Sequence, residues 1–164
     1  MKPYPDLEIT LDRAGDEAED EYRIDMLFSD PGRDVPNYPL ADSGSVSVRL
    51  DPEQLLSLQA DPAAYGLQLS SMLFTDPVKT AFALVRGEVG ASEHMRLRQR
   101  IRKSANSLHG LRCETITNPL NEGRTLMTSH SVQISRFIES GDFLLTDSRT
   151  RDDQRAQIVV EHPT

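Results

Sequence analysis

The chain has 164 residues, and its 26 acidic and 18 basic side chains give a net charge of -8 at neutral pH. This length favours one domain, or one structural part of a larger protein, with room for a substantial core. No apolar run is long enough to cross a bilayer or to act as a signal peptide. The single cysteine, Cys113, excludes an internal disulfide and fits a reducing compartment, so we expect a cytoplasmic protein.

The charges are unevenly distributed along the chain. Residues 1–62 hold 15 acids and 5 bases, whereas residues 77–113 hold 8 bases and 2 acids. The two regions either pair with each other across a sheet, or the basic region offers a surface to a negatively charged partner. The sequence leaves both alternatives open.

The first third of the chain favours β-structure. Alternating apolar residues predict strands at 7–11, 22–28 and 46–50. The acidic stretch 12–21 is expected to form a hairpin loop, and the proline-containing stretch 33–44 a second loop. Short links between successive strands favour an antiparallel meander.

Three Asp-Pro dipeptides follow, and each fits an N-cap aspartate with proline at the first helical position. They are Asp51-Pro52, Asp61-Pro62 and Asp76-Pro77. The helices that they predict cover residues 53–59, 63–74 and 78–85, with the last one ending at Gly87.

The centre of the chain changes from period two to a helical period. Residues 95–102 alternate, which predicts a strand with Met95, Leu97, Gln99 and Ile101 on a buried face and four arginines on the other. The apolar residues after it predict a short amphipathic helix that ends at Asn118-Pro119: Leu108, Leu111, Cys113 and Ile116. We expect this strand-helix unit to form the centre of the domain.

The last part of the chain returns to β-structure. Strands are predicted at 125–128 and 132–138, followed by a polar linker at 141–155. The apolar, β-branched run at 157–161 resembles the first buried strand of a parallel sheet. The predicted fold class is therefore α+β or α/β, with antiparallel N-terminal strands, three short helices, the central strand-helix unit and further strands.

The arginines of the central strand are the candidate interaction surface. Side chains on one strand face lie about 7 Å apart, and such a row can bind a phosphate chain or an acidic protein segment. No aromatic residues interleave with them, which disfavours binding of single-stranded nucleic acid. The alternative is a salt-bridged or solvated sheet face. The four residues are Arg96, Arg98, Arg100 and Arg102.

Other chemically active residues favour structural roles. Cys113 and His109 are four residues apart, as in a nucleophile–base pair, but Cys113 belongs to the apolar stripe, which favours packing. Glu114 and Arg136 are expected to form an ion pair between the central helix and the strand behind it. No motif for a cofactor is present, and the remaining histidines lack metal-ligand spacing: His94, His130 and His162.

Several short segments, taken together in their order and spacing, resemble a known family. They are Tyr65-Gly66, Leu69, Leu73-Phe74, Val78, the Leu-Arg-x-Arg strand, Leu108-His109-x-Leu111-Arg112-x-Glu114-Thr115, Asn118-Pro119, Leu126 and Ser135-Arg136-Phe137. Together they resemble the N-terminal half of CHAT domains, which are caspase-like cysteine peptidase domains of the caspase–separase class. Cys113 stands where that family usually has tryptophan, which agrees with a packing role.

The resemblance implies that the catalytic His and Cys lie in a C-terminal caspase-like half, so no catalytic residue is assigned in this chain. It implies an N-terminal subdomain at 1–140, a linker at 141–155 and the first strand of the caspase-like core at 156–164. The implied partners are that catalytic half, from the same gene or a separate chain, and a regulatory sensor. The implied setting is a bacterial defence or programmed-death system.

Two other functions remain open from the sequence. The chain is either a stand-alone interaction module that binds a partner protein through a strand edge or the arginine row, or an independent enzyme that uses Cys113 and His109. The second of these predicts activity that is sensitive to thiol alkylation.

Overall fold

The structure is a computed structural model that describes residues 4–15, 19–32, 35–39, 45–90, 93–121 and 123–139. Within these residues, six strands form one sheet in the order β3-β2-β1-β5-β6, and β4 pairs with β2 beside this path. The strands are β1 (Asp6–Arg13), β2 (Glu21–Asp30), β3 (Val35–Pro39), β4 (Val46–Arg49), β5 (Met95–Ile101) and β6 (Val132–Ile138).

The sheet is mixed. β2 is antiparallel to β1, β3 and β4, whereas β1, β5 and β6 run parallel to one another. The α+β fold class and the antiparallel N-terminal strands are thus confirmed. β3 is a difference, because it lies within the stretch 33–44 that was predicted as a loop. Its prolines are compatible with a strand because β3 lies at an edge, where one side of the backbone needs no partner.

Three α-helices follow β4, as predicted: α1 (Pro52–Ser57), α2 (Pro62–Leu73) and α3 (Asp76–Val89). Two of the predicted caps are present, since the Asp51 carboxylate accepts a hydrogen bond from Gln54 N at 3.0 Å, and Asp61 caps α2 in the same way. The third cap is wrong, because α3 begins at Asp76 itself. α3 also continues through Gly87 and ends at Gly90, whose φ of 92° favours glycine.

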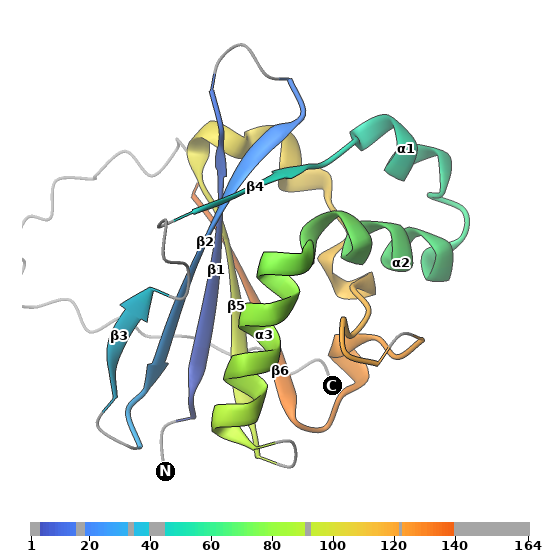
Figure 1. Cartoon of the computed structure of the whole chain (residues 1–164). Helices are drawn as coiled ribbons and strands as arrows, with labels where there is room; N and C mark the ends of the chain where they lie inside the picture. The colour runs from blue at the N-terminus through green and yellow to red at the C-terminus, as the bar shows by residue number, and fades with distance from the viewer. Residues whose placement is uncertain are drawn as a thin grey trace, which may run out of the picture.

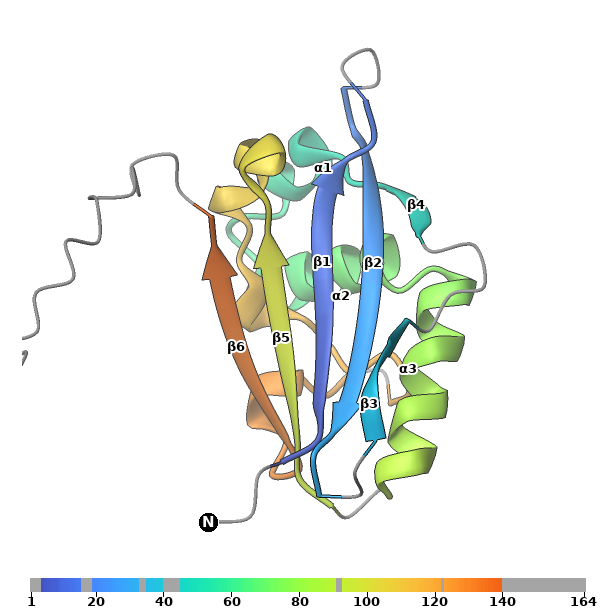
Figure 2. The same cartoon turned by 90° about the vertical axis from the view of Figure 1, so that its left-hand side faces the viewer.

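The helices lie on one face of the sheet and leave the other face open within the described residues (Figures 1 and 2). The covered face carries the alternating apolar residues of the strands. Leu7 of β1, for example, lies opposite Phe28 of β2 and Leu97 of β5, and all three are at most 1% exposed. α3 contributes Phe82, and the rings of Phe74 and Phe82 pack edge to face at 5.5 Å.

The segment after β5 differs from the prediction. In place of one amphipathic α-helix it forms two 3₁₀ helices, η1 (Lys103–Gly110) and η2 (Cys113–Thr115). The predicted strand at 125–128 is also wrong, since residues Leu126–Thr128 form a third 3₁₀ helix, η3. Three-residue turns bury the same apolar side chains that suggested the α-helix, because the spacings of the two helix types differ little over one or two turns.

None of the described helices is both long enough and apolar enough to cross a membrane. The predicted linker at 141–155 and the predicted strand at 156–164 lie outside the described residues.

Candidate interaction surface

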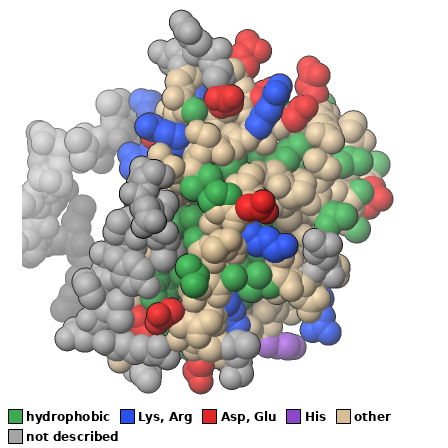
Figure 3. All heavy atoms as spheres, in the orientation of Figure 1, with side chains coloured by type: hydrophobic (Ala, Val, Ile, Leu, Met, Phe, Trp, Pro, Cys, Tyr) green, Lys and Arg blue, Asp and Glu red, His purple; other side chains and the backbone are tan. Residues whose placement is uncertain are grey.

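The candidate interaction surface lies on the open face of the sheet. Arg96, Arg98 and Arg100 project from β5 on the side opposite the buried residues, and Arg102 follows directly after the strand. Figure 2 shows this face with no described helix in front of the strands, and Figure 3 shows basic side chains gathered at the upper left. The period-two prediction for this strand is confirmed.

The arginines are paired with carboxylates of β1. Asp6 contacts two of them, Arg98 at 3.2 Å and Arg96 at 3.6 Å, because β1 and β5 run parallel with Asp6 opposite Arg96. Glu8 contacts Arg100 at 3.6 Å. These pairs join the acidic first third of the chain to its basic middle, as the pairing alternative predicts for this part of the sheet.

The guanidinium groups of this face lie nearer to solvent than the carboxylates that they contact. Asp12 is shared by Arg102 at 3.9 Å and by Arg23 of β2 at 3.8 Å, so these ion pairs join three described carboxylates to five guanidinium groups. Glu21 and Asp25 of β2 add two more carboxylates to the same face. The arginine side chains of β5 are 35–45% exposed, whereas the carboxylates of β1 are about 20% exposed. Exposed pairs of this kind each stabilise a fold by less than about 1 kcal/mol, and the outermost groups stay able to bind an anion.

A hollow of about 270 Å³ lies on this face between β5 and β6. Arg98, Arg100, Ser135 and Phe137 border it, together with Glu8. The Phe137 side chain is 57% exposed, and the guanidinium of Arg100 lies 5.6 Å from the centre of its ring. This hollow offers two guanidinium groups and one aromatic ring to a partner.

Cys113 and His109 do not form a catalytic pair on one helix. They lie in separate 3₁₀ helices, and Cys113 is buried in the core. Burial raises the pKa of the Cys113 thiol to about 11, and the nearby guanidinium of Arg136 offsets only part of this effect. The thiol is therefore protonated at neutral pH, which disfavours a nucleophilic role.

The predicted ion pair between Arg136 and Glu114 is wrong. Its guanidinium donates to the carbonyl oxygens of Leu111 at 2.9 Å, Leu108 at 3.4 Å and His109. Glu114 pairs instead with Arg112, at 3.4 Å. The signal was in the sequence, since alternation along β6 places residue 136 on the same face as the buried Val132.

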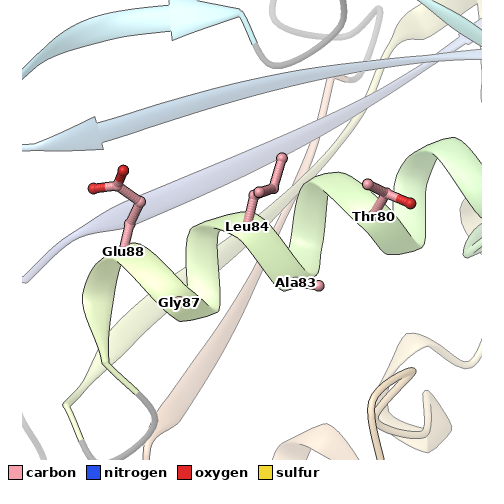
Figure 4. Close-up of a pocket in the computed structure, with 5 residues that line it drawn as sticks. All are labelled: Thr80, Ala83, Leu84, Gly87 and Glu88. Carbon is pink, nitrogen blue, oxygen red and sulfur yellow. The ribbon is translucent and has the colours of Figure 1, made fainter.

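A second hollow lies beside α3 and is larger, about 650 Å³ (Figure 4). Thr80, Ala83, Leu84, Gly87 and Glu88 line it, and Leu84 and Glu88 project from the same side of the helix. Leu84, 61% exposed, is the one large apolar side chain among these five residues. A single leucine gives this hollow no chemistry that identifies a ligand.

Comparison with known proteins gives no further assignment: no protein-family model matches the sequence, and no curated protein matches it. Among the described residues, no three His, Cys, Asp or Glu side chains lie close enough together to hold a metal ion.

Proposed function

We propose that this chain is the non-catalytic N-terminal half of a CHAT-type caspase-like cysteine peptidase, and that it acts in the cytoplasm in a bacterial defence or programmed-death system. In this proposal it supports a catalytic caspase-like half and relays activation from a sensor domain or protein. One observation carries the proposal: the separate segments that resemble the family lie against one another in the fold.

The first of these contacts joins the Leu108–Thr115 segment to the Ser135–Phe137 segment. They are more than twenty residues apart in the chain, yet Arg136 donates to three carbonyl groups of the first segment. A lysine has one ammonium group and cannot reproduce this planar, multidentate arrangement. Arg136 thus holds the two segments against each other, which is a structural reason for a protein that has one segment to have the other as well.

The second contact joins the Tyr65-Gly66 segment to the same region. The Tyr65 hydroxyl accepts a hydrogen bond from Arg112 N at 3.3 Å, and the guanidinium of Arg112 lies 5.8 Å from the Tyr65 ring centre. A Cβ atom at position 66 would lie 2.0 Å from the carbonyl oxygen of Thr115, so only glycine fits. The resemblance therefore rests on residues that pack as one unit.

The state of Cys113 agrees with a non-catalytic half. A buried thiol whose pKa is raised to about 11 is a poor nucleophile, and its place in the core is one that a tryptophan also fills in the family. We therefore assign peptide-bond cleavage to a separate caspase-like half and assign no catalytic residue here.

The decisive experiment begins with the coding sequence downstream of codon 164 and with the neighbouring reading frames. The proposal requires a Gly-His-Gly-like segment and, after it, a cysteine segment. Absence of both would overturn it. Where they are found, this chain and the downstream half are produced as two chains, and the proposal predicts that they copurify and that peptidase activity is lost when the downstream cysteine is replaced by alanine.

The alternative function is a stand-alone interaction module, and the position of β6 at the edge of the sheet, among the described residues, favours it. Met95 N donates to Ser131 O, and Glu139 N donates to Ile101 O. The odd-numbered residues of β6 therefore direct their backbone N–H and C=O groups towards β5. The even-numbered residues then direct their N–H and C=O groups away from β5, where a partner strand can pair with them.

Two matched variants test this alternative. Ile134→Pro removes an edge N–H group, whereas Ile134→Ala removes the same side chain and keeps that donor. Loss of partner binding in the proline variant alone assigns the edge; equal binding by both excludes it. For the arginine row, Arg98→Glu and Arg100→Glu are expected to abolish binding to an acidic partner, and unchanged binding would remove the row from consideration.

A further inference from the structure

A polar hollow of about 350 Å³ lies where β5 and β6 begin, beside the segment that precedes β6 in Figure 1. It is separate from the arginine face and from the motif contacts described above. Its lining residues all carry polar side chains: His94, Asn118, Asn121, Arg124, Thr125, Thr128, Ser129, His130 and Ser131.

The parallel arrangement of the two strands brings these residues together. Parallel strands begin at the same edge of a sheet, and Met95 of β5 lies opposite Val132 of β6. The residues just before each strand, His94 and Ser131, are therefore neighbours, and the backbone bond from Met95 N to Ser131 O, 2.9 Å long, holds them there. His94, just before β5, and His130, two residues before β6, therefore line the same hollow.

The loop between Thr117 and Thr125 places Arg124 at the hollow. Thr117 and Thr125 form an isolated β-bridge, and Asn118 N donates to Arg124 O at 2.7 Å. Gly123 turns the chain back with a φ of 98°, a conformation that favours glycine. These contacts fix the backbone of Arg124 beside the two strand ends.

The described residues that line the hollow carry a charge opposite in sign to the net charge of the chain. Arg124 makes no ion pair with a described residue, and no described carboxylate lines the hollow, although the chain carries a net charge of -8. Two histidines add positive charge when they are protonated. An excess of cationic side chains in an acidic chain raises the local concentration of anions.

The remaining lining groups supply hydrogen-bond donors. The Asn118 carbonyl Oδ1 accepts from Leu120 N at 3.0 Å, which orients the side-chain amide and leaves its NH₂ group as a donor. Ser131 is held by Arg86 of α3, whose guanidinium donates to the Ser131 hydroxyl at 3.3 Å. The hydroxyls are bonded in pairs, Thr125 with Thr128 at 2.8 Å and Ser129 with Ser131 at 3.2 Å. The Asn118 amide and the Arg124 guanidinium are therefore the donors of this space that suit a tetrahedral oxyanion.

We propose that this hollow binds a tetrahedral oxyanion, a sulfate or phosphoryl group, through Arg124, His94 and His130. The site is independent of the proposed peptidase role, and either proposal can fail without the other. Its volume also admits a group larger than a bare ion, so pyrophosphate is compared with phosphate to separate a lone phosphoryl group from a phosphorylated small molecule.

The test is a titration of the whole chain with sodium sulfate, at constant ionic strength set by sodium chloride, followed by amide NMR shifts. We expect saturable shifts at residues 94, 124 and 131, and Arg124→Ala is expected to weaken binding by about tenfold or more, the usual effect of losing one charge-assisted hydrogen bond. Lys103→Ala is the matched control, since it removes one exposed charge beyond the opposite end of β5. Shifts that do not saturate, or equal binding by both variants, would overturn the proposal.

Two further variants test the histidines separately, at a single pH. His94 faces Tyr4, whose ring centre is 5.8 Å away, and His130 precedes Ser131, just before β6 begins. His94→Gln and His130→Gln remove the imidazole and keep a side chain that can form hydrogen bonds. We expect both to weaken sulfate binding; affinities equal to that of the unchanged protein would overturn the role of the histidines.

Discussion

Replacing Gly66 with alanine tests the packing of α2 against η2, the contact that joins two of the family-like segments. An added Cβ atom would lie 2.0 Å from Thr115 O, 2.8 Å from the carbonyl carbon of the same residue and 3.1 Å from its Cβ. The neighbour is backbone and not the end of a flexible side chain. Relief therefore requires α2 and η2 to separate by more than 1 Å, since ordinary contact begins at about 3.4 Å.

Two opposing effects set the magnitude. Alanine is favoured over glycine in a helix interior by about 1 kcal/mol. Overpacking of a well-packed core costs about 1–3 kcal/mol and more where backbone must move. Here the neighbouring backbone is also held by Ser70, whose hydroxyl accepts from Thr117 N at 2.7 Å. We therefore place the substitution at the upper end of that range and expect a net destabilisation of about 2 kcal/mol.

The matched control is Gly87→Ala on α3. Position 87 is also inside a helix, but an added Cβ meets no atom within 4 Å, as its place in the open hollow of Figure 4 illustrates. This variant is expected to gain about 0.5–1 kcal/mol. Urea unfolding followed by circular dichroism measures both, and the Gly66 variant should lower the midpoint by about 1 M. Equal midpoints for the two variants, or a more stable Gly66→Ala protein, would refute the close approach of α2 and η2.

Three further predictions follow from single side chains. Arg136→Lys is expected to lower the unfolding free energy by about 2 kcal/mol, because the two guanidinium nitrogens of Arg136 reach carbonyls that the single nitrogen of an ammonium group cannot reach together; an unchanged urea midpoint would contradict this. Arg100→Ala should cost less than about 1 kcal/mol, and the difference should shrink in 1 M NaCl; a larger, salt-independent loss in the same urea assay would count against a surface pair. The Cys113 thiol should resist iodoacetamide at neutral pH in the native protein, as mass spectrometry can show. Because its pKa is raised from 9.0 to about 11, the stability that it contributes below pH 9 is lost as the pH rises towards 11, and Cys113→Ala should remove that loss.

Alternation along the strands could be read from the sequence because one face of the sheet is covered and the other is open. The alternation that buries Leu7 places Asp6 and Glu8 on the open face of the sheet, and the same alternation places Arg96 and Arg98 of β5 there. Placing acids and bases side by side needed one further fact, that β5 lies beside β1. Parallel pairing of residues ninety positions apart, such as Asp6 with Arg96, depends on how the intervening helices pack, which no local pattern contains.

The 3₁₀ helices could not be predicted from apolar spacing, and Arg136 supplies the physical reason. An α-helix through residues 108–116 would use the carbonyls of Leu108 and Leu111 for its own N–H groups four residues later. In the fold these carbonyls accept from Arg136, and the Leu108 carbonyl also accepts from Leu111 N, three residues later, at 3.1 Å. The Arg136 donor comes from a distant strand and supports the 3₁₀ arrangement, so the local sequence alone could not predict it.

The contacts of Arg136 also bear on how this region responds to change. Because one guanidinium links β6 to η1 and to Leu111 directly after it, a displacement of β6 alters all three acceptors together. Buried groups around it have little alternative hydrogen bonding: Gln99 Oε1 and His109 Nε2 have no partner among the described residues. Removing the Arg136 guanidinium would leave further carbonyl groups in this region without that donor, which is why its replacement is expected to be costly.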